Sequence, residues 1–312
     1  MKKILVTGGY GFVGGRLVRS LSAENKIVVS TRNLLSDEQR LLHGDVEQVV
    51  HSSLFTSNTF PKDCDTVIHL AALNEKDCVT QPSEAIRVNI DETRIVLEQA
   101  IQSGVKHFIF FSTAHIYGSP LQGNITEETL PVPVHPYAIT HKAAEDYVIA
   151  ANNAGRIKGT VIRLSNSFGA PVLPTVNRWT LLANDLCRQA IEKRKLVLLS
   201  NGCQYRDFVC LNDAENAIRQ IVAQTPTGIY NLGSGKAVRV IDMAKEIAGV
   251  YEELFSEKIN IVLPEDSVPS EEPLLHYSVN KLKALGIAIA NKTQQELKEL
   301  LLFCKQHFNY TG

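Results

Sequence analysis

The sequence has almost no imbalance of charge and no long apolar segment. Lysine and arginine together number 32, aspartate and glutamate 33, and the formal net charge is −1. A strongly basic surface for nucleic acid is therefore not indicated. No apolar run reaches the roughly 18–20 residues that span a bilayer. The short apolar run after Lys2 and Lys3 ends at Thr7-Gly8-Gly9, which is not the pattern of a secretory signal. These absences predict a cytoplasmic protein that binds neither nucleic acid nor membranes.

Metal-binding and disulfide patterns are also lacking. The six cysteines and nine histidines are dispersed along the chain, and no C-x-x-C pair occurs. We therefore expect reduced, packed thiols and no zinc site. The content of 44% apolar and 21% charged residues excludes a collagen-like, low-complexity or mainly disordered chain.

Short β-branched runs alternate with helix-length segments through the first 165 residues, which is typical of βαβ units on a parallel sheet. We expect strands at 3–7, 26–31, 65–70, 107–112 and 160–164, and helices at 12–24, 83–102 and 137–152. Later segments predict a helix at 178–192, short strands at 196–199, 207–210 and 228–231, and helices after Asp213 and Val240. The expected fold is α/β, with a doubly wound, Rossmann-like parallel sheet in residues 1–169. Residues 170–312 are expected to form a small α/β substrate lobe, some of whose elements return to the first domain.

A glycine-rich segment between the first strand and the first helix carries the strongest local signal. Gly9, Gly11 and Gly14 match G-x-G-x-x-G in the strand–turn–helix context that a dinucleotide site requires. The glycines permit a tight turn, a close approach of the backbone to a pyrophosphate and close packing of helix on strand. The helix N-terminus then offers free N–H groups to the phosphates. The candidate cofactor-binding residues of this segment are Gly8, Gly9, Gly11, Phe12, Val13 and Gly14.

The end of the second strand bears on which dinucleotide binds. An NAD site usually has an acidic residue there for the ribose 2′-hydroxyl, whereas an arginine accommodates a 2′-phosphate. The sequence reads Ser30-Thr31-Arg32-Asn33 and contains no carboxylate. Arg32 therefore favours NADP as the cofactor, although Arg32 as a solvated charge at a strand end, with NAD bound instead, stays open.

An ordered set of motifs resembles the extended short-chain dehydrogenase/reductase family, which includes nucleotide-sugar epimerases and dehydratases. The set comprises 43–46 (HGDV), 69–72 (HLAA), 88–90 (VNI), 112–118 (STAHIYG), Tyr137 opening a helix, 163–169 (RLSNSFG), 206–208 (RDF) and 230–235 (YNLGSG). The resemblance covers nearly the whole chain and implies NAD(P) as cofactor and a nucleotide sugar as substrate. It also implies a homodimer, formed by pairing the helices at 83–102 and 137–152.

The resemblance assigns roles to individual positions. It places Asp45 and Val46 beside the adenine, and Leu70, Ala71 and Ala72 along the cofactor groove. Asn89 would support the central sheet at the cofactor site, Asn166 would face the phosphates of the sugar nucleotide, and Arg206 would pair with its diphosphate.

The chemistry itself requires a proton relay. A hydride leaves or joins a carbinol carbon only if the hydroxyl proton moves too, so a general acid/base must touch that oxygen. Tyr137 matches the tyrosine of the family and Thr113 the hydroxyl residue that shares the substrate oxygen. A tyrosine with a pKa near 10 is a weak base at pH 7. The family lowers that pKa with a lysine one helical turn later and with the positive nicotinamide ring.

The sequence departs from the family at that lysine. His141 occupies its position four residues after Tyr137, and Lys142 lies about 140° around the helix from the tyrosine. A protonated His141 would lower the pKa of Tyr137, whereas a neutral one would only orient the nicotinamide ribose. Reduced or lost catalysis is the third alternative, and it would make the chain a dinucleotide-sensing module.

A second departure narrows the reaction. The 4,6-dehydratases of the family carry Asp-Glu directly after the threonine, and this chain has Ala114-His115. Elimination of water is therefore disfavoured, and hydride transfer at one sugar carbon, C4 by resemblance, is expected. His115 is a candidate substrate contact and acid/base, or a histidine held by its neighbours. An epimerase and a net C4 dehydrogenase or 4-ketoreductase share this machinery, so these alternatives stay open.

Overall fold

A seven-stranded sheet forms the centre of the computed structural model, which describes residues 1–32, 34–50, 55, 60–265, 268 and 270–310. Its strands lie in the order β3-β2-β1-β4-β5-β7-β11, and every neighbouring pair is parallel. Their bounds are β1 Lys3–Thr7, β2 Lys26–Thr31, β3 Val46–Val50, β4 Thr66–His69, β5 His107–Thr113, β7 Lys158–Leu164 and β11 Gly228–Leu232. The expected doubly wound, Rossmann-like α/β sheet is confirmed.

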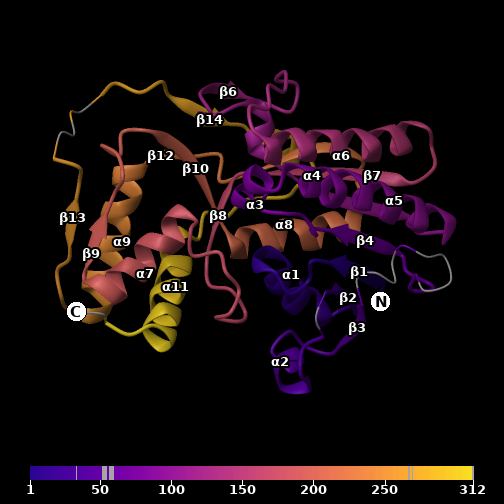
Figure 1. The fold of residues 1–312 in the computed structure, drawn as a ribbon, viewed down its shortest axis with the longest axis horizontal. Coiled ribbons are helices and arrows are strands. Elements are labelled where there is room, and N and C mark those ends of the chain that lie inside the picture. The colour runs from indigo at the N-terminus through magenta and orange to yellow at the C-terminus, as the bar shows by residue number, and fades with distance from the viewer. Residues whose placement is uncertain (33, 51–54, 56–59, 266–267, 269, 311–312) are drawn as a thin grey trace.

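Helices cover both faces of this sheet (Figure 1). One face is covered by α1 (Phe12–Ser22) and α8 (Leu211–Gln224), and the other by α4 (Pro82–Ala85), the π-helix η2 (Ile86–Glu92), α5 (Thr93–Gln102) and α6 (Pro136–Asn153). Leu17 and Ile218 pack on the first face, and Leu97 and Val148 on the second. Because side chains of both orientations are buried, the central strands are almost continuously apolar.

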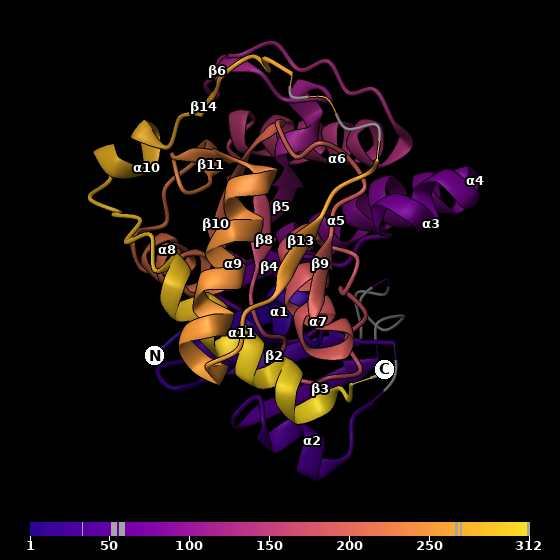
Figure 2. The same ribbon diagram turned by 90° about the vertical axis from the view of Figure 1, so that its left-hand side faces the viewer.

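The second half of the chain builds a separate core beside the sheet. Its main helices are α7 (Leu182–Lys193), α9 (Val240–Phe255) and α11 (Thr293–His307), which pack around a cluster that includes Trp179 and Met243. Figure 2 shows α9 and α11 side by side, with α7 next to them. Two small sheets border this core: β8 (Asn166–Phe168) with β10 (Tyr205–Cys210) and β12 (Ala237–Arg239), and β9 (Lys195–Val197) with β13 (Asn260–Val262). A third, β6 (Gly123–Ile125) with β14 (Leu275–Tyr277), lies against β10 and β12 and contributes to a separate small apolar cluster. The remaining short elements are α2 (Asp37–Leu41), α3 (Glu75–Thr80), the 3₁₀ helix η3 (Ala114–Tyr117) and α10 (Asn280–Ala284).

The structure differs from the expected elements in several places, and it adds elements that the sequence did not predict, among them α3 and α11. The helix expected at 83–102 contains the π-helix η2, which buries Asn89. The helix expected from residue 178 begins only at Leu182, because residues 176–181 form a turn that carries Arg178. The edge strand β3 was not predicted, since Glu47 and Gln48 interrupt its apolar pattern. In the part of the chain that the structure describes, no helix is both long and apolar enough to cross a membrane.

Candidate active site

A cleft of about 680 Å³ opens at the carboxyl ends of the central strands. In a doubly wound sheet this edge is where ligands bind. The end of β1, the end of β2 and the loop after β4 form one arm of the cleft. The ends of β5 and β7, the start of α6 and the turn at 173–181 form the other.

The glycine-rich turn between β1 and α1 forms the floor of the first arm. Gly8 has a φ of +66°, and a Cβ on it would lie 3.0 Å from the backbone nitrogen of Ala71. A Cβ on Gly14 would lie 2.2 Å from the carbonyl oxygen of Gly8. No side chain of the described residues caps α1, whose first residue Phe12 lines the cleft together with Gly11, Val13 and Gly14. Bare backbone at an uncapped helix N-terminus fits the pyrophosphate of a dinucleotide. Gly9 faces Val29 instead, and does not line the cleft.

The loop after β4 forms the wall of this arm. Leu70, Ala71 and Ala72 line it, as the resemblance implied. The Thr7 hydroxyl accepts hydrogen bonds of 3.2 Å from the backbone N–H groups of Leu70 and Ala71. Asn89 is 2% exposed and is absent from the described residues that line the cleft. Its side-chain oxygen accepts from Leu73 N at 2.8 Å, so it holds the wall in place from behind.

The structure does not bring Asp45 and Val46, expected beside the adenine, to this cleft. Val46 begins β3 and pairs with Ile27, near the amino end of β2, whereas the cleft lies at the carboxyl end. Val46 is buried in the core, and Asp45 is exposed in the turn before it. The resemblance placed the motif before β3, although only the residues that follow a strand reach this edge. Arg32 does line the cleft at the end of β2, and Asn33 lies outside the described residues.

Thr113 and Tyr137 meet where the two arms join. Thr113 ends β5, and Tyr137 is the second residue of α6, which begins after the N-cap His135. Both side chains line the cleft. Burial is the main influence that raises the pKa of Tyr137, and the negative charge of Glu75 raises it further. The positive charge of Arg178 and the Thr113 hydroxyl act in the opposite direction on the same pKa.

His141 lies directly against Tyr137. The two ring centroids are 4.1 Å apart, and His141 Nδ1 lies 2.8 Å from the backbone oxygen of Tyr137. That contact assigns the proton to Nδ1 and leaves Nε2 as an acceptor. Burial lowers the pKa of His141 to about 4. Of the alternatives for this residue, the geometry therefore supports the neutral one and disagrees with a charged His141 at pH 7.

Lys142 does not reach the tyrosine. Its ammonium group pairs with Asp146 and lies 4.0 Å from Glu145, both farther along α6. This contact agrees with the angle of about 140° that separates positions i and i+5 on a helix.

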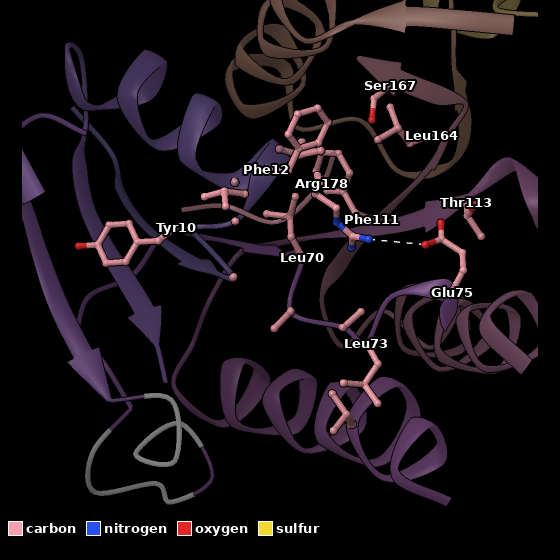
Figure 3. Close-up of a pocket in the computed structure, with 18 of the residues that line it drawn as sticks. Tyr10, Phe12, Leu70, Leu73, Glu75, Phe111, Thr113, Leu164, Ser167 and Arg178 are labelled. Carbon is pink, nitrogen blue, oxygen red and sulfur yellow. Dashed lines mark ion pairs between the residues drawn. The ribbon is translucent and has the colours of Figure 1, made fainter. Parts of the chain in front are cut away.

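Two charged side chains at this end of the cleft have no motif in the sequence. Glu75 is the first residue of α3, and Arg178 comes from the turn before α7. Figure 3 shows the Arg178 guanidinium directed at the Glu75 carboxylate on the side of the cleft where Thr113 lies. Their closest nitrogen and oxygen atoms are 3.5 Å apart. Nothing in the sequence around either residue predicts that it belongs to the site. The two side chains meet only because the second half of the chain packs beside α3.

A second cleft of about 460 Å³ continues from the reaction end into the C-terminal half. Glu75, His115 and Asn166 line both clefts, and Arg206 lines only the second. Arg206 is half-buried, and its guanidinium has no ion-pair partner among the described residues. Burial lowers the pKa of Arg206.

His115 lies at the junction of the two clefts. Burial is the main influence that lowers its pKa, and its Nδ1 has no hydrogen-bond partner among the described residues. Asn166 donates from Nδ2 to the backbone oxygen of Asp207 at 3.0 Å, which fixes its amide beside Arg206.

Comparison with known proteins agrees with this architecture. A dTDP-D-glucose 4,6-dehydratase of Bos taurus is 24% identical over 99% of this chain and 90% of its own length. A UDP-glucuronic acid 4-epimerase of Bacillus cereus, solved with UDP-glucuronic acid and NAD, has a TM-score of 0.80 at 22% identity, over 98% of this chain and all of that one. RMD of Pseudomonas aeruginosa, solved with NADPH, has a TM-score of 0.77 at 20% identity, over 99% of this chain and all of that one.

The sequence model of the NAD dependent epimerase/dehydratase family matches residues 4–233, which include the glycine-rich turn, Thr113, Tyr137 and Arg206. The chain therefore belongs to the NAD dependent epimerase/dehydratase family.

Proposed function

We propose that the protein is an NAD(P)-dependent enzyme that moves a hydride at C4 of a nucleotide sugar. The observation that carries the proposal is the position of Thr113 and Tyr137 in the first cleft, next to His115, which lines both clefts. One cleft has bare backbone and a helix N-terminus for a dinucleotide. The other has the Arg206 guanidinium, which no described carboxylate pairs with, for an anion.

The first cleft is proposed to hold the cofactor. Gly11 and Gly14 would bring the start of α1 to the pyrophosphate, with the loop at 70–72 along its length. Arg32, at the end of β2, supports NADP over NAD, since a guanidinium complements a 2′-phosphate. The bound dinucleotide supplies the acceptor and donor of the hydride.

Tyr137 is proposed to take the hydroxyl proton of the substrate and to return it. Thr113 would hydrogen-bond the same substrate oxygen and hold it near Tyr137. A neutral His141 would accept a hydrogen bond from a ribose hydroxyl through Nε2, because its Nδ1 already donates to the Tyr137 carbonyl oxygen.

The second cleft is proposed to hold the diphosphate of the sugar nucleotide. A half-buried guanidinium without a counter-ion is costly unless a bound anion neutralises it. Arg206 would bind that anion, and Asn166 lies beside it on the neighbouring strand.

Epimerisation or net redox chemistry is preferred over dehydration. Ala114 and His115 follow Thr113, and no carboxylic acid pair occupies these positions. A ketone formed at C4 would then be reduced again, either on the other face of the sugar or as a net reduction.

We also propose that the protein forms a homodimer through the helical segment at 83–102, which comprises most of α4 with η2 and α5, and through α6. Ile139 and Tyr147 on α6 are 49% and 45% exposed, and Ile86 at the start of η2 is 56% exposed. A second copy would cover these side chains. Tyr147→Glu should convert the dimer into a monomer in analytical ultracentrifugation, and a parent protein that sediments as a monomer would contradict the proposal.

The substrate proposal is tested with a panel of UDP-, dTDP-, GDP- and CDP-sugars. Arg206→Ala should raise KM by about tenfold or more with a smaller change in kcat, because the diphosphate is held similarly before and during hydride transfer. Arg219→Ala, at an exposed position on α8, is the matched control. Equal KM values for parent and Arg206→Ala across the panel would contradict a sugar-nucleotide substrate.

A further inference from the structure

The residue at position 141 supplies no positive charge next to Tyr137, where the family has a lysine. If Tyr137 acts as the proposed proton relay, its deprotonated form carries a negative charge that must be stabilised. His141 is neutral near pH 7, and Lys142 is paired with Asp146. The following inference rests on the proposed function and concerns which group of this chain supplies the missing positive charge.

Three arginines line the first cleft among the described residues, and their partners differ. Arg32 lies at the end of β2, in the arm proposed for the cofactor. Arg87 is held between Glu84 and Glu92. Arg178 has a single carboxylate, Glu75, at 3.5 Å. Arg178 is therefore the arginine at the reaction end whose charge is not already offset by two carboxylates.

The backbone around Arg178 is anchored on both sides. Arg178 N donates to Val176 O at 3.0 Å, and Leu181 N donates to Arg178 O at 3.3 Å. The next residue, Trp179, is 7% exposed and packs against Phe308 with ring centroids 4.8 Å apart. The C-terminal core thus holds the turn, and the guanidinium projects from it into the cleft (Figure 3).

The ion pair between Glu75 and Arg178 is exposed to solvent and has only one long contact. The two side chains are 44% and 31% exposed, and only one nitrogen–oxygen contact of 3.5 Å joins them. An exposed single contact of this kind contributes little to stability. It leaves much of the guanidinium charge available to a neighbouring anion.

Several other groups face Tyr137 from the surrounding elements. They are Cys78 with Glu75 on α3, Thr113 on β5, His115 on η3, His135 before α6 and His141 on α6. The negative charge of Glu75 raises the pKa of Tyr137, and the positive charge of Arg178 lowers it.

We propose that Arg178 is a positioning residue that supplies the positive charge that position 141 lacks. It acts on Tyr137 from the C-terminal half of the chain, and Glu75 partly offsets its charge. Arg178 takes no proton. As the hydride leaves C4 for the dinucleotide, the hydroxyl proton passes to the Tyr137 oxygen, and it returns when the ketone is reduced. Arg178 would stabilise the charged form of Tyr137 before that transfer.

The direct test places a fluorinated tyrosine at position 137 of the full chain and follows its ¹⁹F chemical shift against pH, with oxidised dinucleotide bound. The readout requires no substrate, so it is separate from a failure of the proposed sugar chemistry. Arg178→Gln should raise the apparent pKa of this phenol by about one unit, and Glu75→Gln should lower it by about as much. Lys142→Gln is the matched control and should leave it unchanged.

The opposite signs make the result specific. General damage to the cleft would move the pKa in the same direction in both variants. An unchanged pKa in Arg178→Gln, shifts of the same sign in the two variants, or a shift in Lys142→Gln as large as that in Arg178→Gln would overturn the proposal.

Turnover provides a second measurement. On the acidic side of the pH profile, the kcat for sugar oxidation should fall about tenfold in Arg178→Gln, because the deprotonated fraction of Tyr137 falls by that factor. Arg178→Lys, which keeps the charge, should restore most of it. A change confined to KM, with kcat and its pH profile as in the parent, would make Arg178 a substrate contact only and overturn the proposed role.

Discussion

A methyl group added to Gly14 would lie 2.2 Å from the Gly8 carbonyl oxygen, which is too close for two non-bonded atoms. The tight turn beneath the cofactor cleft therefore requires a residue without a side chain at this position. Gly14→Ala should destabilise the fold by about 1–3 kcal/mol and weaken dinucleotide binding, because the backbone must shift to admit the methyl group. Gly249→Ala is the matched control, since a Cβ there meets no atom within 4 Å and α9 should gain about 0.5–1 kcal/mol. Urea unfolding and cofactor titration measure both effects. A Gly14→Ala variant that behaves like Gly249→Ala would contradict the close packing of the turn.

The proposed preference for NADP depends on another single residue, Arg32. Arg32→Asp should weaken NADP binding by about ten- to a hundredfold, the equivalent of about 1.5–3 kcal/mol for a charge-assisted contact, while NAD binding changes less. Calorimetric titration of both dinucleotides measures the difference. Equal losses for the two, or tighter binding of NAD by the parent protein, would contradict the assignment to NADP.

Sequence motifs predict only part of the candidate site at this scale. Thr113 and Tyr137 stand in motifs of fixed spacing, and both line the cleft. Glu75 and Arg178 lie about a hundred residues apart in segments without a motif, and their meeting depends on how the two halves of the chain pack. Asp45 lies before β3 and away from the cleft, because a four-letter match does not say whether a motif precedes or follows its strand.

At the scale of elements, a buried ion cluster ties the nucleotide-binding helix to the C-terminal half. Arg16 on α1 pairs with Glu215 on α8 and, at 2.8 Å, with Glu296 on α11. Glu296 also accepts a hydrogen bond from Asn212 N, and burial raises its pKa. The helix whose N-terminus faces the cofactor cleft is thereby fixed to residues that lie 199 and 280 positions farther along the chain.

Loss of the central cation should therefore be costly. Arg16→Met leaves the buried Glu296 and the largely buried Glu215 carboxylates without their cation and should lower the free energy of unfolding by about 3–5 kcal/mol. Arg156→Met removes the partly exposed pair with Glu98, and should change the free energy of unfolding much less. Urea unfolding of the two variants measures the difference. Equal losses would contradict a structural role for the buried cluster.

The elements that the sequence predicts well are the buried parallel strands, whose β-branched runs match β1 and β2 residue for residue. The edge strand β3 escapes this pattern, because one of its sides is exposed and carries Glu47. The turn at 176–181 was interpreted as the start of a helix. Helical spacing of apolar residues continues through it, but the chain turns there to bring Trp179 into the C-terminal core.

At the scale of the whole molecule, buried neutral histidines predict how stability depends on pH. His107 on β5 is 1% exposed, and its Nε2 lies 2.7 Å from the Thr160 hydroxyl on β7. Burial, assisted by the charge of Lys2, lowers its pKa from 6.5 to about 4. The unfolded chain therefore takes up this proton at a higher pH than the folded one, and stability is lost as the pH falls from about 6.5 towards 4.

The loss assigned to His107 amounts to roughly 2–3 kcal/mol at pH 4.5. His107→Gln should be less stable than the parent at pH 7 but lose about that much less on acidification. His276→Gln, at an exposed position, serves as the control. Urea unfolding at pH 7 and at pH 4.5 measures the difference, and parallel losses in parent and His107→Gln would contradict a buried neutral His107.

The proposed mechanism requires that a dinucleotide in the first cleft and a sugar nucleotide in the second both reach one proton relay, Tyr137. The most direct measurement compares the parent with Tyr137→Phe in two assays: calorimetric titration of the dinucleotide, and turnover of a nucleotide sugar that the parent converts. The variant should bind the dinucleotide with nearly the parent affinity while turnover falls by about 10²–10⁴-fold, the usual contribution of a general acid/base. Turnover within tenfold of the parent, with the dinucleotide still bound, would contradict the account.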